Sequence, residues 1–174
     1  MVLQISLHHS KVASAALCVA MKSFDVALIQ VSLTKNGTIS GLKEVDGELV
    51  YSRSNQNPRA SILIKKGFQI LPLMHHCSMD QTAVIIKTSS GKGPGEMILG
   101  SAYLPYDDVE FPYPGELERL VMGCRAERTH LITIYDANSH HTSWGSTNIK
   151  NRGETLFNYI VMNVNSANTF INKH

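Results

Sequence analysis

Polar side chains follow directly after an apolar run near residue 131, and their types are those that phosphoester chemistry uses. The run from Leu131 to Tyr135 is rich in β-branched and aromatic residues, which is typical of a buried strand, and it leads into Asp136. Because Asp136 and Asn138 are two positions apart at the mouth of that strand, their side chains can point into one pocket. An Asp can orient a water or hold a metal ion, and an Asn can bind a phosphate oxygen. An ordinary Asp-x-Asn turn is the alternative interpretation.

Further candidate binding residues lie in the same stretch, namely His140, His141 and Trp144. The two histidines form one of three His-His pairs, and none of these pairs has another His or Cys at the spacing of a zinc site. Trp144 can either stack on a base or pack beneath its own loop. Tyr103 ends another apolar run, and it can either donate to a phosphate or pack in the interior.

The elements that must position these residues begin with a strand, a helix and a second strand. We expect strands at Val2 to Leu7 and Asp25 to Val31, with Ser10 capping a helix that runs to about Ser23. A crossover of this length predicts parallel neighbours in one sheet. The apolar stripe expected for this helix consists of Val12, Ala15, Ala16, Val19 and Ala20, and the residues expected in solvent are Lys11, Ser14 and Lys22.

The middle of the chain predicts a meander of antiparallel strands. The expected strands are Glu48 to Arg53, Ala60 to Lys65, Phe68 to Met74, Gln81 to Thr88 and Met97 to Leu104. Asp46-Gly47 is a hairpin signal, Lys66-Gly67 indicates a tight turn between two of the strands, and the glycine-rich segment 89–95 indicates a hairpin loop.

Two helices and a short strand complete the prediction. A helix at Gly115 to Arg128 should face inward with Leu117, Leu120 and Val121. The second helix follows Asn151-Arg152-Gly153, and its expected apolar stripe is Leu156, Phe157, Ile160 and Val161. A strand begins near Asn168, so the sheet is expected to be incomplete at residue 174.

Composition predicts a single domain with no bias toward a particular partner. The chain has 174 residues and a net charge of +2 from 16 basic and 14 acidic residues, a balance that neither favours nor excludes nucleic acid. Its three cysteines show no disulfide or zinc spacing. There is no signal-peptide pattern and no apolar run of membrane-spanning length, so we expect a protein inside the cell, with the nucleus as one possible location.

Several segments together resemble the endonuclease/exonuclease/phosphatase family, and more closely the endonuclease domain of insect non-LTR retrotransposons. The most specific segment is Asp136-Ala-Asn-Ser-His-His-Thr-Ser-Trp-Gly-Ser146. The others, in matching order, are Leu3 to Lys11, Asp25 to Gln30, Pro58 to Ile64, Ser101 to Pro105 and Asn151 to Glu154. Almost the whole chain is covered by the resemblance.

The resemblance implies a two-sheet α/β sandwich with helices outside, and Mg²⁺-dependent hydrolysis of the DNA backbone. It implies that Asp136 orients or deprotonates the attacking water, that Asn138 contacts the scissile phosphate and that Tyr103 supports the phosphate or the leaving group. It further implies that His140, His141 and Trp144 contact DNA. No protein partner and no membrane follow from it.

The chain departs from this family at positions that concern the metal ion. Val31 follows Gln30 where the family has a metal-binding Glu, and Ser6 replaces an Asn that helps to position the metal. The family's C-terminal Ser-Asp-His segment would lie beyond residue 174. Asp25 is at the opposite end of its strand, about 20 Å from Val31, and cannot substitute, whereas Asp107 and Asp108 are nearer candidates.

The sequence therefore predicts a C-terminally truncated endonuclease domain spanning residues 1–174, with impaired or no activity and an unknown metal site. A DNA-binding module without cleavage is a second hypothesis, in which Lys65, Lys66, Arg125 and Arg128 contact phosphates. A third is a phosphatase or exonuclease of the same superfamily, which the segment around Trp144 disfavours. The fourth is the poorly folded product of a degenerate open reading frame.

Overall fold

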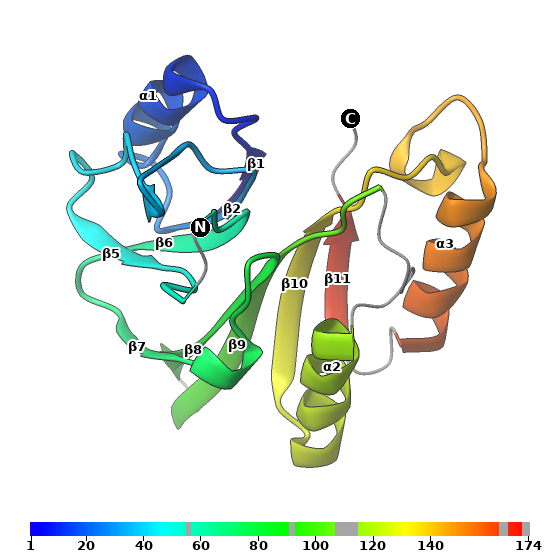
Figure 1. The fold of residues 1–174 in the computed structure, drawn as a ribbon. Helices are drawn as coiled ribbons and strands as arrows, with labels where there is room; N and C mark the ends of the chain where they lie inside the picture. Colours follow the sequence, from blue (N-terminus) through cyan, green and yellow to red (C-terminus); the bar gives the residue numbers. More distant parts are fainter. Residues whose placement is uncertain (55–56, 91–92, 107–114, 164–166, 172–174) are drawn as a thin grey trace.

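Two sheets face each other, with helices on their outer sides (Figure 1). The computed structural model describes residues 1–54, 57–90, 93–106, 115–163 and 167–171. The first sheet has the order β1-β2-β6-β5, and its strands are Val2–Ser6, Val26–Gln30, Ala60–Lys65 and Gly47–Val50. The second has the order β11-β10-β9-β8-β7, and its strands are Ala167–Ile171, His130–Asp136, Gly93–Tyr103, Gln81–Ser90 and Gln69–Pro72.

The remaining elements are three helices, two short 3₁₀ turns and a small hairpin in the described part of the chain. The helices are α1 (Lys11–Ala20), α2 (Gly115–Glu127) and α3 (Asn151–Asn163). The 3₁₀ turns are η1 (Met74–His76) and η2 (Thr142–Trp144), and the hairpin strands are β3 (Thr34–Lys35) and β4 (Thr38–Ile39). No helix among the described residues has both the length and the apolar character needed to cross a membrane.

The strand-helix-strand unit at the start of the chain forms as predicted. β1 and β2 are parallel neighbours, with Val2 opposite Val26 and Ser6 opposite Gln30. Ser10 caps α1, because its Oγ accepts a hydrogen bond from the Ala13 amide at 3.3 Å. This unit places the end of β2 at the same edge of the sheet as the end of β1.

The predicted inward face of α1 is wrong. Val12 and Val19 are 79% and 65% exposed, whereas Ser14 and Leu17 are buried. Leu17 offers more apolar area than any residue of the predicted stripe, so the helix turns this side toward the sheet. Ser14 can be buried because its hydroxyl donates to the Ser10 carbonyl at 2.9 Å.

The strands predicted for the antiparallel meander form, but they are divided between two sheets, and one predicted hairpin is wrong. Gly47 begins β5 opposite Lys65 of β6, so Asp46-Gly47 opens a strand instead of joining two neighbours in a hairpin. Lys66-Gly67 forms the predicted tight turn between two strands, and this turn carries the chain from β6 of the first sheet to β7 of the second. A turn signal reports local backbone conformation and says nothing about which sheet the next strand joins. The hairpin of β8 and β9 does form, with Ser90 opposite Gly93.

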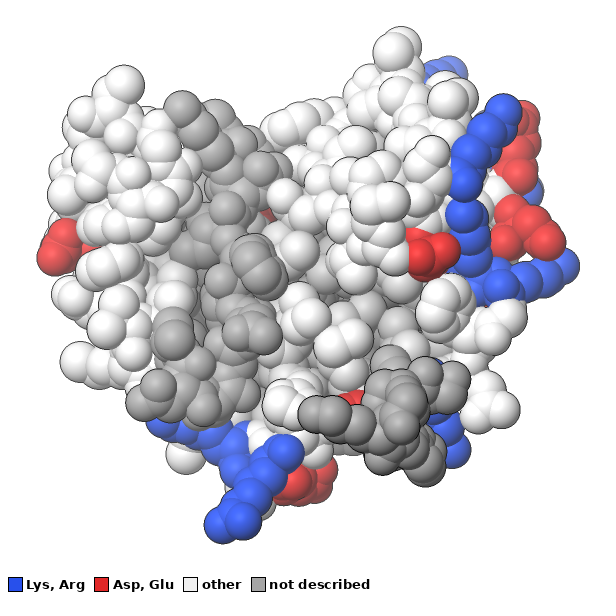
Figure 2. All heavy atoms as spheres, turned by 180° about the vertical axis from the view of Figure 1, so that it is seen from behind, with Lys and Arg blue, Asp and Glu red and all other residues white. Residues whose placement is uncertain are grey.

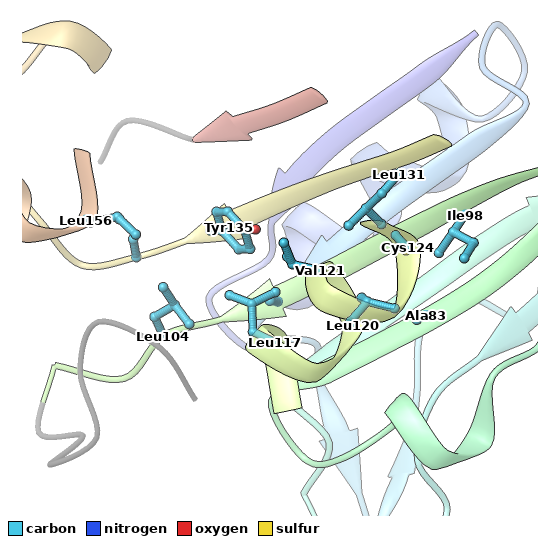
Figure 3. Packing of buried hydrophobic residues seen from close by; sticks show 12 residues of the cluster. Ala83, Ile98, Leu104, Leu117, Leu120, Val121, Cys124, Leu131, Tyr135 and Leu156 are labelled. Atoms are coloured by element: carbon cyan, nitrogen blue, oxygen red, sulfur yellow. The ribbon is translucent and has the colours of Figure 1, made fainter. Parts of the chain in front are cut away.

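Apolar residues form three layers because alternate residues of the central strands point to opposite faces. Val26 and Leu28 of β2 pack between the two sheets, whereas Ala27 and Ile29 pack under α1. In β10, Ile134 points to the layer between the sheets. The opposite face of β10 packs under α2, where Leu131 and Tyr135 meet Leu117, Leu120 and Val121 as predicted (Figure 3).

The buried face of α3 was predicted in part. Leu156 is fully buried, and Phe157 and Ile160 are partly buried. Val161 is 56% exposed, and Tyr159 is buried instead of it. The strand predicted near Asn168 is β11, which lies parallel to β10. Asp107 and Asp108, the nearer carboxylates named above, lie outside the described residues.

Candidate functional site

Asp136 and Tyr103 stand opposite each other at the ends of two parallel strands. β9 and β10 pair in parallel, and Asp136 and Tyr103 are the last partners in their register. Asp136 is 1% exposed, and its carbonyl accepts a hydrogen bond from the Leu104 amide at 2.8 Å. Since parallel strands end at the same edge of a sheet, the structure brings these two predicted site residues together.

Both side chains point into the layer between the two sheets. Asp136 shares a face of β10 with Ile134, and Tyr103 shares a face of β9 with Leu99, two residues of that layer. Toward the site the layer changes from apolar to polar. Gln30 is fully buried there and crosses between the sheets, its Nε2 donating to Ser101 Oγ at 2.8 Å. The candidate site is therefore the polar end of the central layer.

An ion pair supports Tyr103 from the side of the first sheet. Arg59 Nε and Nη2 donate to the two carboxylate oxygens of Asp80 at 2.5 and 2.6 Å. The guanidinium carbon of Arg59 lies 5.0 Å from the centre of the Tyr103 ring, within the range of a cation–π interaction. The Asp80 carbonyl also accepts from the Tyr103 amide at 2.8 Å. The pair fixes both the ring and the backbone of Tyr103.

Val31 follows β2 at this edge in a strained conformation. Its φ of 50° is in the left-handed region, which costs an L-residue roughly 1 to 2 kcal/mol and is least favourable for a β-branched side chain. Two hydrogen bonds hold it there: its amide donates to the Arg59 carbonyl at 2.6 Å, and its carbonyl accepts from the His9 amide at 2.9 Å. Backbone strain of this kind concentrates at functional sites.

The described residues at this edge do not fit a Mg²⁺ ion well. Mg²⁺ prefers carboxylate oxygens in an octahedral arrangement, and Val31 offers no donor. Asp80 is held by Arg59 in a bidentate pair, which leaves Asp136 as the carboxylate facing the central layer in the described part of the chain. Ser6 Oγ is buried and without a hydrogen-bond partner among the described residues, but a hydroxyl is a weak ligand. Residues 1–54, 57–90, 93–106, 115–163 and 167–171 contain no cluster of three His, Cys, Asp or Glu side chains suited to a metal.

Asn138 leaves the strand in the left-handed conformation and faces a pocket. Its φ is 46°, a value that Asn tolerates better than most residues, and its Nδ2 donates to the Leu104 carbonyl at 3.3 Å. The pocket has a volume of about 420 Å³ and is lined by residues of the loop after β10 and of the start of α3, including His140. The exposed His140 accepts or donates a hydrogen bond with Asn148 through Nδ1 at 3.0 Å.

His141 and Trp144 hold the loop that carries this pocket. His141 is 5% exposed, stacks on Phe157 with ring centroids 4.4 Å apart, and accepts from the Ser143 amide at 3.1 Å. Trp144 packs against the core cluster that contains Tyr135 and Leu156, and its indole nitrogen donates to the Ser139 carbonyl at 3.0 Å. Of the two interpretations of Trp144, packing beneath its own loop is the one that the geometry favours.

The four cations considered for DNA binding lie at the other end of the sheets. Lys65 donates its amide to the Asp25 carbonyl before β2, and Lys66 pairs with Asp46 at 2.5 Å. Arg125 and Arg128 lie at the end of α2, near the start of β10. In the view from behind, the Lys and Arg side chains of the described residues lie mainly along the rim of the molecule (Figure 2). The described surface inside this rim carries few charged side chains (Figure 2). These cations are therefore not assembled with Asp136.

The structure adds basic residues that the sequence did not single out. Arg59 and Lys150 occur in or beside segments quoted for the resemblance, but nothing local marks them as site residues. Arg152 donates to the carbonyls of Leu104 and Pro105 at 3.2 and 2.7 Å, so it fixes the turn after Tyr103. The Asn-Arg-Gly segment just before a predicted helix was the one signal that could have indicated this role.

A solved structure with the same arrangement of sheets and helices is the endonuclease domain of TRAS1, a telomere-specific non-LTR retrotransposon. The likeness has a TM-score of 0.73 and covers 92% of this chain and 69% of that chain, with 23% sequence identity. No family model matches the sequence, and no match is found among curated proteins. The α/β fold of a retrotransposon endonuclease domain, predicted from the sequence, is confirmed.

Proposed function

We propose that this chain is an endonuclease-type domain that binds DNA at the polar end of its central layer and cleaves phosphodiester bonds slowly or not at all. The observation that carries the proposal is the register of Asp136 with Tyr103 at one edge of the sheet, with Asn138 following two residues after Asp136 and bonded to the Leu104 carbonyl. The same fold in a retrotransposon endonuclease domain supports DNA as the substrate.

Each residue has a role that its position permits. Asp136, a buried carboxylate, orients the attacking water, and Asn138 binds the phosphate through its side-chain amide. Tyr103, held against Arg59, supports the phosphate or the leaving group. His140 contacts the DNA strand from the pocket wall. His141 and Trp144 contribute to DNA binding by holding the loop after β10.

Impaired cleavage follows from the side chain at position 31. Hydrolysis of a phosphodiester requires stabilisation of developing negative charge, for which related enzymes use a metal ion held by carboxylates. Val31 supplies none, so the site keeps groups that orient water and phosphate without a full donor set for a cation. The second candidate function, DNA binding without cleavage, is favoured by this observation.

A binding titration tests the DNA-binding part of the proposal, and a plasmid-nicking assay tests its cleavage part. Fluorescence anisotropy with a labelled duplex should show an affinity that falls steeply as salt increases, because binding releases counterions from phosphates. Asn138→Ala should weaken it, while Lys65→Ala, at the far end of the first sheet, should not. Absence of affinity even at low salt would eliminate both candidate functions.

A further inference from the structure

We infer that the pocket between the loop after β10 and the start of α3 binds one phosphate group of a nucleic-acid strand, next to the phosphodiester at Asn138. The inference rests on the proposed function and assigns a second contact point to the same substrate. At about 420 Å³ the pocket is within the range of small-ligand sites and can accommodate a phosphate with part of its sugar.

The charge of the pocket favours an anion. Among the described residues that line it, His140, Lys150 and Arg152 are basic and none is acidic. Lys150 is exposed, and the part of the chain that is described places no carboxylate within ion-pair distance of its amino group. Lys66 and Arg59, in contrast, are engaged with Asp46 and Asp80. Lys150 is therefore a cation positioned at a concave surface and available to a ligand.

The backbone at the start of α3 adds hydrogen-bond donors. The Lys150 carbonyl accepts from the Glu154 amide at 3.0 Å, so the helix begins directly after Lys150. The amides of the first turn have no acceptor within the helix, and the dipole of a 13-residue helix favours negative charge at this end. Asn151, the first helical residue, lines the pocket.

Two further features show that the pocket is preorganised and incompletely satisfied. Arg152 is fixed in its wall by donation to the Ala137 and Pro105 carbonyls at 3.3 and 2.7 Å. Ser139 Oγ is buried in the same wall and has no hydrogen-bond partner among the described residues. A buried hydroxyl without a partner is costly, so a phosphate oxygen that reached it after a small shift of the pocket loop would gain a hydrogen bond.

The single tryptophan provides a direct readout. Trp144 is the only Trp of the chain, and its indole nitrogen is bonded to the Ser139 carbonyl, so its fluorescence reports on the pocket loop. The full chain is titrated with inorganic phosphate, with thymidine 3′,5′-bisphosphate and with uncharged thymidine. The same variants are titrated with a labelled DNA duplex by anisotropy.

Lys150→Gln should weaken bisphosphate binding about tenfold and reduce the salt dependence of duplex binding by about one phosphate contact. Ser139→Ala should weaken the bisphosphate, and Lys66→Gln, an equal change of charge at the far end, should alter neither ligand. The assignment fails if thymidine binds as tightly as the bisphosphate, or if Lys66→Gln weakens binding as much as Lys150→Gln.

This design distinguishes a nucleic-acid strand from a free nucleotide as the source of the phosphate. It also distinguishes failure of this inference from failure of the proposed function. If Lys150→Gln weakens the bisphosphate and leaves duplex affinity unchanged, the pocket takes a free nucleotide, and its assignment to a strand is overturned. If the wild-type chain binds the bisphosphate but no duplex at any salt concentration, the proposed DNA-binding function fails and the strand assignment fails with it, while the anion pocket remains.

Discussion

Asp136 and Tyr103 are the final pair in the parallel register of β10 and β9, and both side chains face the space between the two sheets. This relationship brings two residues that are 33 positions apart in the sequence together in one candidate site. It also explains why residues of the first sheet matter, because Gln30 and Arg59 reach the same space from the other side.

The cation–π contact between Arg59 and Tyr103 should be measurable as an energetic coupling. In a double-mutant cycle of Arg59→Met and Tyr103→Leu, we expect a coupling of about 1 kcal/mol in the free energy of unfolding. Chemical denaturation of the four proteins measures it. The same cycle with Arg53→Met in place of Arg59→Met is the control, since Arg53 lies over Tyr51 instead. Additive effects for Arg59 and Tyr103 would show that the ring is held by packing alone.

Position 31 should accept a carboxylate and thereby gain affinity for a divalent cation. Val31→Glu removes a β-branched side chain from a left-handed conformation and adds an oxygen donor at the edge that carries Asp136. We expect millimolar Mg²⁺ to raise the melting temperature of Val31→Glu more than that of the wild type. Val31→Gln is the matched control of equal size, and an equal Mg²⁺ response of the two variants would refute the idea.

Gly153 should be intolerant of any side chain. A Cβ there would lie 1.9 Å from the His140 carbonyl oxygen, a backbone atom that must move together with the pocket loop. We expect Gly153→Ala to lower the free energy of unfolding by about 1 to 3 kcal/mol and to weaken DNA binding. Gly123→Ala, in α2 with nothing within 4 Å of the added Cβ, should instead be stabilising by up to about 1 kcal/mol. Similar effects of both substitutions would contradict the close approach.

Alkaline pH should destabilise the fold through Cys124. Burial raises the pKa of this thiol to about 11, above its value in an unfolded chain. Because the unfolded thiol ionises first, stability is retained below about pH 8.5 and lost as pH rises toward 11. Between pH 8 and 10 the wild type should lose about 1 to 2 kcal/mol more unfolding free energy than Cys124→Ala. Parallel pH profiles of the two proteins would mean that the thiol does not titrate differently on folding.

Local patterns in the sequence predicted the elements better than their partners. The strand-helix-strand start and the buried face of α2 follow from periodicity, and both are confirmed. The inward face of α1 was wrong because small apolar residues occur all around this helix, and only packing against Gly41 and the first sheet selects Leu17 and Ser14.

For the candidate site too, the sequence predicted individual residues better than the contacts between them. Asp136 and Tyr103 end strands and Asn138 follows one, which a sequence reveals, whereas the pair of Arg59 with Asp80 joins residues 21 positions apart whose approach depends on how two sheets stack. The roles of His141 and Trp144 in holding the loop also depend on contacts with α3 and with the core cluster around Leu156 that no spacing indicates.

Nicking of supercoiled plasmid in Mg²⁺ by the wild type, Val31→Glu and Val31→Glu/Asp136→Asn tests the central claim most directly. The proposed site predicts little or no nicking by the wild type, a clear gain in Val31→Glu, and loss of that gain when Asp136 is also replaced. Robust nicking by the wild type that Val31→Glu leaves unchanged would contradict an impaired site, and nicking that survives Asp136→Asn would contradict the site itself.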